Sequence, residues 1–266
     1  MSPDVDGLAV TPPMGWNSWN AFGERVDETV IRQTAGAMAA SGLRGCGYRA
    51  IVIDDCWSVM EGRDRDGNLV PDPIRFPSGM KSLADHVHDL GFEFGIYSDA
   101  AERTCAGYPG SYGYEEQDAH LWASWGIDLL KYDYCHAPRD RGTAVDRYAR
   151  MGEALRATGR PIVYSICEWG ERSPHRWGRR AGGHMWRVSN DVLDRWEDVD
   201  RAFDIAAEVA PYGGRGGWND LDMLVVGLNG RGQIPGAGMT LEEYRTQMTM
   251  WCVACSPLMI GCDVRT

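Results

Sequence analysis

Short apolar runs alternate along the chain with longer segments in which apolar residues recur every three or four positions. The short runs are rich in β-branched and aromatic residues and are bounded by Gly, Pro and Asp, which is typical of strands. Eight of them are expected as strands, at residues 14–19, 48–55, 92–99, 127–135, 162–169, 185–191, 222–227 and 257–263. Strand–helix alternation favours parallel strands, and eight strands favour a single (β/α)8 TIM-barrel domain over residues 1–266.

The segments between these runs have the apolar spacing of helices that cover a sheet. The clearest are residues 27–42, 79–91, 144–159 and 194–210. Gly42, Gly91 and Gly159 close three of them, as expected where a helix ends in the left-handed conformation. The connection 56–79 is too long for a simple loop, and its Asp-Gly pair at 66–67 predicts a small hairpin.

Polar side chains collect at the ends of the predicted strands. In LLKYDYC, Lys131, Asp133 and Cys135 alternate and therefore point to one side of a strand. Other runs also end in polar groups, namely Asp54, Asp55, Asp99, Glu168, Arg187, Asp191 and Asp263. One such acid is usually the N-cap of the next helix. Because a TIM barrel gathers these ends at its active-site face, six runs of this kind predict a carboxylate-lined site.

Composition narrows the class of partner. A formal net charge of −11 repels phosphate backbones, so no nucleic acid is expected and a neutral substrate is favoured. Most of the 11 tryptophans are expected in the core, although flat aromatic faces also suit sugar rings. No apolar run is long enough for a membrane helix, and no signal peptide is recognised. We therefore expect a cytoplasmic protein if Met1 is the true start, or a secreted one if a leader was removed; the oligomeric state is not indicated.

The eight cysteines do not suggest a metal centre. Cys252 and Cys255 form a C-x-x-C without a second pair at zinc-site spacing, and we expect them to be buried helical thiols one turn apart. A magnesium site built from aspartates is the main chemical alternative. Lys131 and Arg187 argue against it because they already neutralise part of the acidic charge.

A neutral pocket lined by carboxylates and tryptophan fits glycoside hydrolysis, in which two carboxyl groups carry out the reaction. Asp133 is the candidate nucleophile, since Lys131 on the same strand face favours its ionised form. Asp191 is the candidate acid/base, in a stretch expected to leave it protonated until the glycosidic bond breaks.

Several long motifs closely resemble α-galactosidases of glycoside hydrolase family 27, in order from about Thr11 to Arg265. They are TPPMGWNSWNAFG, IDDCW, RFPSGMKSLADHVHDLGFEFGIYSD, TCAGYPGSYGYEEQDAHLWASWGIDLLKYDYC, YSICEWG, WRVSNDV and GGWNDLDMLVVG. The resemblance implies a TIM barrel, a retaining double-displacement mechanism, and no metal or organic cofactor. It also implies a small galactoside or oligosaccharide as substrate.

Matched motif by motif, the resemblance implies Asp133 as nucleophile, with Lys131 binding sugar hydroxyls, and Asp191 as acid/base. Arg187 is expected at the C2 hydroxyl of the sugar.

The resemblance also implies that the remaining motifs form the walls of the sugar pocket. Asp54 and Asp55 are expected to hold the C4 and C6 hydroxyls. Trp16 is expected on the apolar side, and Glu168 and Trp169 beside C2, where a bulky acid disfavours an N-acetyl group.

The resemblance also implies a disulfide between Cys105 and Cys135. Glu24 stands where many relatives have the cysteine that bonds the one in IDDCW, so Cys56 lacks that partner and Cys46 is a possible substitute. The chain stops at IGCDVRT, and we expect it to lack the last helix and the C-terminal β-domain of its relatives.

Two other functions stay open. One is a β-L-arabinopyranosidase, although aspartate rather than glutamate at Asp55 leaves space for the C6 group of galactose. The other is a non-catalytic galactose-binding barrel, which would have lost a catalytic carboxylate. The leading hypothesis is an exo-acting α-galactosidase.

Overall fold

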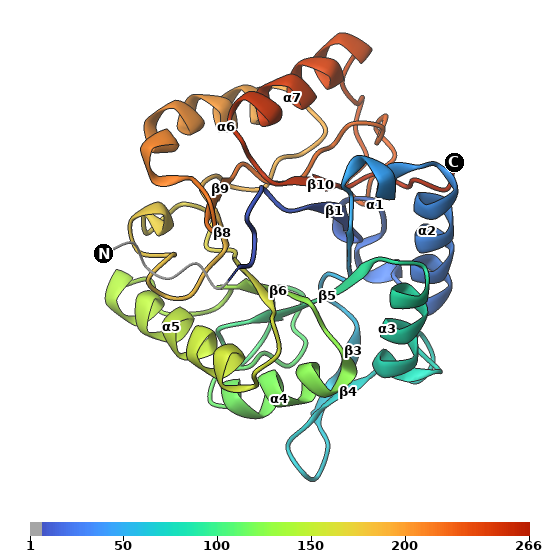
Figure 1. Ribbon diagram of the computed structural model, residues 1–266, viewed down its shortest axis with the longest axis vertical. Helices are drawn as coiled ribbons and strands as arrows, with labels where there is room; N and C mark the ends of the chain where they lie inside the picture. The colour runs from blue at the N-terminus through green and yellow to red at the C-terminus, as the bar shows by residue number, and fades with distance from the viewer. Residues whose placement is uncertain (1–6) are drawn as a thin grey trace.

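A barrel of eight parallel strands surrounded by helices forms the protein, as the computed structural model of residues 7–266 shows (Figure 1). The barrel strands are β1 (Met14–Asn17), β2 (Ala50–Val52), β5 (Glu93–Asp99), β6 (Leu129–Asp133), β7 (Val163–Ile166), β8 (Met185–Arg187), β9 (Trp218–Asp220) and β10 (Leu258–Ile260). They are ordered β10-β1-β2-β5-β6-β7-β8-β9. The predicted TIM-barrel class is therefore confirmed.

The barrel closes beyond the end of β9. Leu224 forms a parallel bridge with Ile260 of β10. The Leu224 N–H donates to the Met259 carbonyl over 2.8 Å, and the Gly261 N–H donates to the Leu224 carbonyl over 2.9 Å. This short stretch of pairing joins the segment after β9 to β10 and so closes the barrel.

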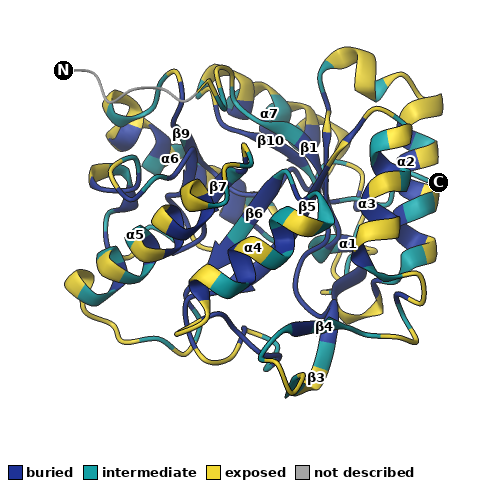
Figure 2. Cartoon of the chain, turned by 60° about the horizontal axis from the view of Figure 1, so that its bottom comes forward, coloured by how far each residue is buried: buried dark blue, intermediate teal, exposed yellow. Residues whose placement is uncertain are grey.

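Helices cover the outside of the barrel and bury one face against it (Figure 2). They are α2 (Glu28–Ala40), α3 (Gly79–Asp89), α4 (Glu115–Trp125), α5 (Arg141–Ala157), α6 (Trp196–Val209) and α7 (Leu241–Val253), whereas the short helix α1 (Trp19–Phe22) follows β1. Among the described residues, no helix is long and apolar enough to cross a membrane.

Local sequence signals explain where these helices begin and end. Asp27 caps α2 by accepting the Val30 N–H, and Thr240 and Glu243 form a capping box at α7. The predicted glycine stops are confirmed, because Gly42, Gly91 and Gly159 all have positive φ.

The long connection after β2 contains the predicted hairpin, formed by β3 (Ser58–Arg63) and β4 (Leu69–Pro71). It extends outward from the barrel (Figure 1). Gly67 turns it with a φ of 85°. The Arg63 guanidinium anchors it through an ion pair of 2.6 Å to the buried Asp118 on α4.

The core has two parts. Most buried apolar side chains lie between the strands and the helices. A smaller cluster comprises Ala50, Val52, Leu129, Met185, Met223 and Met259, on strands around the barrel and on the segment after β9. Polar side chains at the strand ends therefore rest on a packed apolar layer, which fixes their positions.

Two sequence expectations are wrong. The seventh strand is β9 at Trp218–Asp220, and not residues 222–227, because only Leu224 of that run pairs with a neighbouring strand. Cys252 and Cys255 are exposed, and α7 ends at Val253, so the two thiols are neither buried nor on one helix face.

Candidate active site

A cavity of about 230 Å³ opens at the carboxyl ends of the barrel strands. This volume is close to the smaller ligand pockets of proteins, a size that suits a single sugar ring. Its charged lining residues are Asp54, Asp55, Lys131, Asp133, Arg187, Asp191, Asp194 and Asp222. Its larger uncharged ones include Trp19, Tyr97, Trp169, Leu193, Met223, Leu228, Gln233 and Ile234.

Asp133 is the last residue of β6 and is almost completely buried. Its Oδ1 accepts the Tyr134 N–H over 2.9 Å, and its Oδ2 accepts the Tyr97 hydroxyl over 3.1 Å. Burial raises the pKa of Asp133 to about 6, although the charge of Lys131 and the Tyr134 N–H oppose the rise. At neutral pH the carboxylate is therefore mostly ionised and rigidly held.

Asp54 is held by several donors after β2. Lys131 Nζ and Asn17 Nδ2 both lie 2.7 Å from its Oδ2. Burial alone would lower the pKa of Lys131, but the Asp54 carboxylate raises it, so Lys131 stays charged. The pair places an anion and a cation side by side on the cavity wall. A sugar hydroxyl can donate to the Asp54 carboxylate and accept from the Lys131 ammonium group.

Asp55 follows directly and fixes the neighbouring loop. Its Oδ2 accepts the Ala106 N–H over 2.9 Å, and its Oδ1 accepts the Cys56 N–H over 2.7 Å. Burial raises the pKa of Asp55 to about 6. Both backbone donors hold its carboxyl group at the cavity edge.

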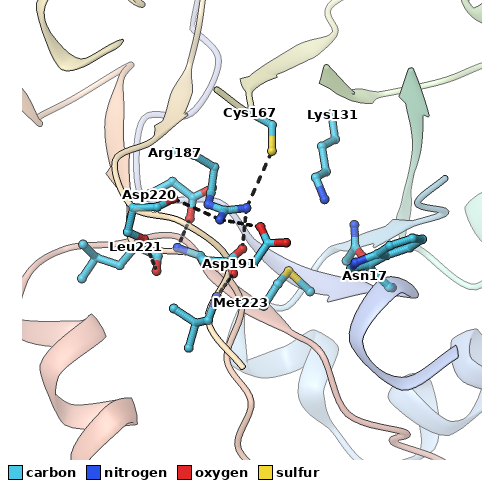
Figure 3. Close-up of polar contacts among 12 residues, drawn as sticks. Asn17, Lys131, Cys167, Arg187, Asp191, Asp220, Leu221 and Met223 are labelled. Atoms are coloured by element: carbon cyan, nitrogen blue, oxygen red, sulfur yellow. Dashed lines mark hydrogen bonds and ion pairs between the residues drawn. The ribbon is translucent and has the colours of Figure 1, made fainter. Parts of the chain in front are cut away.

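The opposite wall is organised around Arg187 at the end of β8 (Figure 3). Its Nη2 lies 3.0 Å from Asp191 Oδ1, and its Nη1 lies 2.7 Å from Asp222 Oδ1. Asp222 Oδ2 also accepts the N–H of Val192, the residue after Asp191, over 2.7 Å. Arg187 and Asp222 therefore both position the segment that carries Asp191.

Protonation at this wall differs from the sequence expectation. Burial alone would raise the pKa of Asp191, but the charges of Arg187 and Lys131 lower it below its ordinary value. The sequence predicts that Asp191 keeps its proton, whereas the ion pair with Arg187 favours the charged carboxylate. Burial raises the pKa of the neighbouring Asp222 to about 7, despite the charge of Arg187.

Two predicted pocket residues are absent from the cavity lining. Trp16 is 0% exposed, and its Nε1 donates to the Cys262 carbonyl over 2.8 Å, so it belongs to the buried core. Glu168 is also 0% exposed, and both of its oxygens accept the Arg172 N–H over 3.0 Å. Trp169, with a φ of 60°, lines the cavity beside it.

A disulfide joins Cys105 to Cys135 at the cavity edge, as the resemblance implied. Cys46 and Cys56 are both free, so the substitute pairing considered for Cys56 is not formed. Asp99 and Asp133 lie close to the two bonded sulfurs. Because those sulfurs are not thiolates, this group offers only two carboxylates to a metal ion.

Sequence reasoning missed several lining residues, notably Asp222 and Tyr97. Asp222 was assigned to the start of a strand at 222–227, whereas the true strand ends at Asp220. Correct placement of that strand would have put Asp222 among the polar groups at carboxyl ends. Tyr97 lies inside β5, and its aromatic ring gave no signal distinct from a core residue.

Fold and site together define a TIM barrel with a carboxylate-lined, sugar-sized cavity of the glycosidase type. The chain belongs to the family described as alpha galactosidase A, whose sequence profile matches residues 11–266.

Named relatives agree with this assignment. The chain is 49% identical over 262 residues to an alpha-galactosidase of Cyamopsis tetragonoloba, covering 98% of this chain and 61% of that protein. It thus spans about three fifths of the length of such curated relatives.

Solved structures show the same fold. Alpha-galactosidase I from Mortierella vinacea superposes with a TM-score of 0.92 at 42% identity, covering 98% of this chain and 69% of that one. An alpha-galactosidase from Saccharomyces cerevisiae with raffinose superposes with a TM-score of 0.90 at 40% identity, covering 98% and 61%. A β-L-arabinopyranosidase from Geobacillus stearothermophilus is a more distant neighbour, with a TM-score of 0.85 at 29% identity, covering 97% and 72%.

Proposed function

We propose that this barrel hydrolyses terminal α-D-galactosyl residues of galactosides and galacto-oligosaccharides, with retention of anomeric configuration. The observation that carries the proposal is the placement of Asp133 and Asp191 in one cavity with the Lys131–Asp54 pair. The family and the named alpha-galactosidase relatives support it, as does the yeast structure with raffinose, an oligosaccharide.

The reaction begins with the sugar ring bound between the two walls. Asp133 attacks the anomeric carbon while Asp191 donates its proton to the glycosidic oxygen, which breaks the bond to the leaving group. A covalent galactosyl–Asp133 ester results. Asp191 then removes a proton from water, and the water oxygen displaces Asp133, which restores both carboxyl groups.

The surrounding residues support each step. The Tyr97 hydroxyl and the Tyr134 N–H aim the Asp133 carboxylate. Asp54, Lys131 and Asp55 bind hydroxyls of the sugar, including the axial C4 hydroxyl that distinguishes galactose from glucose.

Arg187 binds the C2 hydroxyl in this proposal. A hydroxyl that takes over part of its hydrogen bonding weakens the ion pair with Asp191. The pKa of Asp191 then rises toward the range in which it acts as an acid.

The deciding experiment compares p-nitrophenyl α-D-galactopyranoside with p-nitrophenyl β-L-arabinopyranoside, using the purified protein and Asp133→Asn. We expect release from the galactoside by the wild type alone. Preference for the arabinoside would establish the other specificity, since that sugar matches galactose without C6. Galactose binding without release from either substrate would show a non-catalytic barrel.

A further inference from the structure

The segment 228–239, between the barrel closure and α7, forms part of the cavity mouth. It contains no helix or strand, yet Leu228, Gly232, Gln233 and Ile234 all line the cavity. Ile234 is 57% exposed, whereas apolar side chains elsewhere in the lining are more buried. Together with Trp19 and Leu193 in the same lining, Ile234 leaves apolar surface at the mouth of a polar cavity, which a bound ligand would cover.

One side of the segment is attached to the strand-end loop that carries Asp191. Asp194 Oδ2 accepts the Gly230 N–H over 2.7 Å, and Asp194 Oδ1 accepts the Tyr244 hydroxyl over 2.7 Å. The Met239 N–H also lies 3.3 Å from Asp194 Oδ1. Asp194 thus holds both ends of the segment at a point three residues from the candidate acid/base.

The other side is attached to the loop after β1. The Gln233 N–H donates to the Asn20 carbonyl over 2.7 Å. A Cβ atom at Gly23 would lie 2.2 Å from Gln233 Oε1, so the Gln233 side chain packs over that glycine. The segment therefore spans the mouth between two fixed points and presents Ile234 beside the opening.

We propose that the segment 228–239 is the binding wall for the leaving group, and that Ile234 contacts the flat apolar face of an uncharged pyranose or aryl group attached to galactose. This inference rests on the proposed function and specifies its second binding site. Trp19 and Leu193 are partly exposed in the same lining and extend the apolar surface. The inner cavity is charged and suits sugar hydroxyls, so the two regions divide the substrate between them.

The test separates binding of galactose from binding of the leaving group. Dissociation constants for galactose and for p-nitrophenyl α-D-galactopyranoside are measured by calorimetry in the Asp133→Asn background, with and without Ile234→Ser. We expect Ile234→Ser to weaken binding of the aryl galactoside about five- to tenfold and to leave galactose binding unchanged. Ile74→Ser is the matched control, since Ile74 is 89% exposed and lies outside the cavity lining.

Turnover distinguishes this inference from the proposed reaction. Ile234→Ser in the otherwise wild-type protein should lower kcat/KM for the aryl galactoside. It should not lower kcat/KM for α-galactosyl fluoride, because the fluoride leaving group is too small to contact Ile234. Equal effects on both ligands, or no effect on either, would overturn the role of Ile234. If Ile234→Ser weakens binding of the aryl galactoside alone, but the wild-type protein hydrolyses neither substrate, the leaving-group wall would be supported and the proposed hydrolysis refuted. Failure to bind either ligand would overturn both.

Discussion

Lys131 Nζ donates a hydrogen bond of 2.7 Å to Asp54 Oδ2, and so connects β6 to the loop after β2 at the cavity wall. The sequence predicts that Lys131 favours the ionised form of Asp133, and the resemblance implies that it binds sugar hydroxyls. The observed pair adds a further role, because Lys131 neutralises a carboxylate that is almost completely buried. Substrate binding and stability therefore depend on the same contact.

Lys131→Met should destabilise the protein. The substitution keeps the volume but leaves Asp54 buried with Asn17 as its remaining side-chain donor, and breaking a buried ion pair costs about 3–5 kcal/mol. Urea unfolding followed by tryptophan fluorescence measures the change in the free energy of unfolding. The double variant Lys131→Met/Asp54→Asn is the control and should regain most of the loss while staying inactive. A single variant within about 1 kcal/mol of wild type would contradict this account.

The roles of the two carboxyl groups can be read from products formed with azide. Asp133→Ala and Asp191→Ala should each lower kcat for an unactivated galactoside at least about a thousandfold. With an activated aryl galactoside, azide attacks directly in Asp133→Ala and gives the β-galactosyl azide. In Asp191→Ala it attacks the covalent intermediate and gives the α-galactosyl azide. Proton NMR of the anomeric centre identifies each product, and exchanged products would reverse the two assignments.

The acid limb of the pH profile should report Asp133. Its pKa is raised to about 6, so kcat/KM should fall as the pH drops through about 6 and the nucleophile becomes protonated. Tyr97→Phe removes the hydroxyl that donates to its carboxylate. Losing a donor to the charged form raises the pKa, so the limb should move to higher pH.

Asp55 titrates in the same range, and Tyr97→Phe serves to tell the two carboxyl groups apart. The Tyr97 hydroxyl contacts Asp133, whereas the donors to the Asp55 carboxylate are the Ala106 and Cys56 amides and the Thr104 side chain. A limb that stays in place in Tyr97→Phe would assign it to a group other than Asp133.

Asp222→Asn should weaken Asp191 as an acid. Asp222 shares Arg187 with Asp191, so above pH 7, where Asp222 is mostly ionised, its neutralisation leaves the guanidinium charge to act on Asp191 and lowers the pKa of that carboxyl further. We expect kcat/KM for melibiose, which needs a proton on its leaving group, to fall about tenfold. Hydrolysis of α-galactosyl fluoride, which needs little acid assistance, is the internal control. Equal losses with both substrates would indicate a structural effect alone.

Much of the barrel was predictable because its signals are local. The periodic helices, their glycine stops and the Asp-Gly hairpin each depend on neighbouring residues, and all were confirmed. The strand at Trp218–Asp220 was missed because two of its three residues are polar, while the more apolar run after it closes the barrel through a single bridge.

The site was less predictable where it depends on which charged side chains the fold brings into contact. Alternation along β6 identified Lys131 and Asp133, but no local pattern shows that Lys131 pairs with Asp54 or that Arg187 lowers the pKa of Asp191. Likewise, Glu168 matches a sugar-pocket motif, yet its carboxylate is occupied by Arg172 four residues later.

The position of β1 between β2 and β10 has a consequence for biosynthesis. Met14 pairs with Leu258, near the opposite end of the described chain. At about 5–20 residues per second, a ribosome needs on the order of ten seconds or more between making these two strands. Throughout that interval one edge of β1 has no partner, and unpaired strand edges favour association with other chains. The yield of folded protein should therefore depend on chaperones that shield this edge until translation reaches β10.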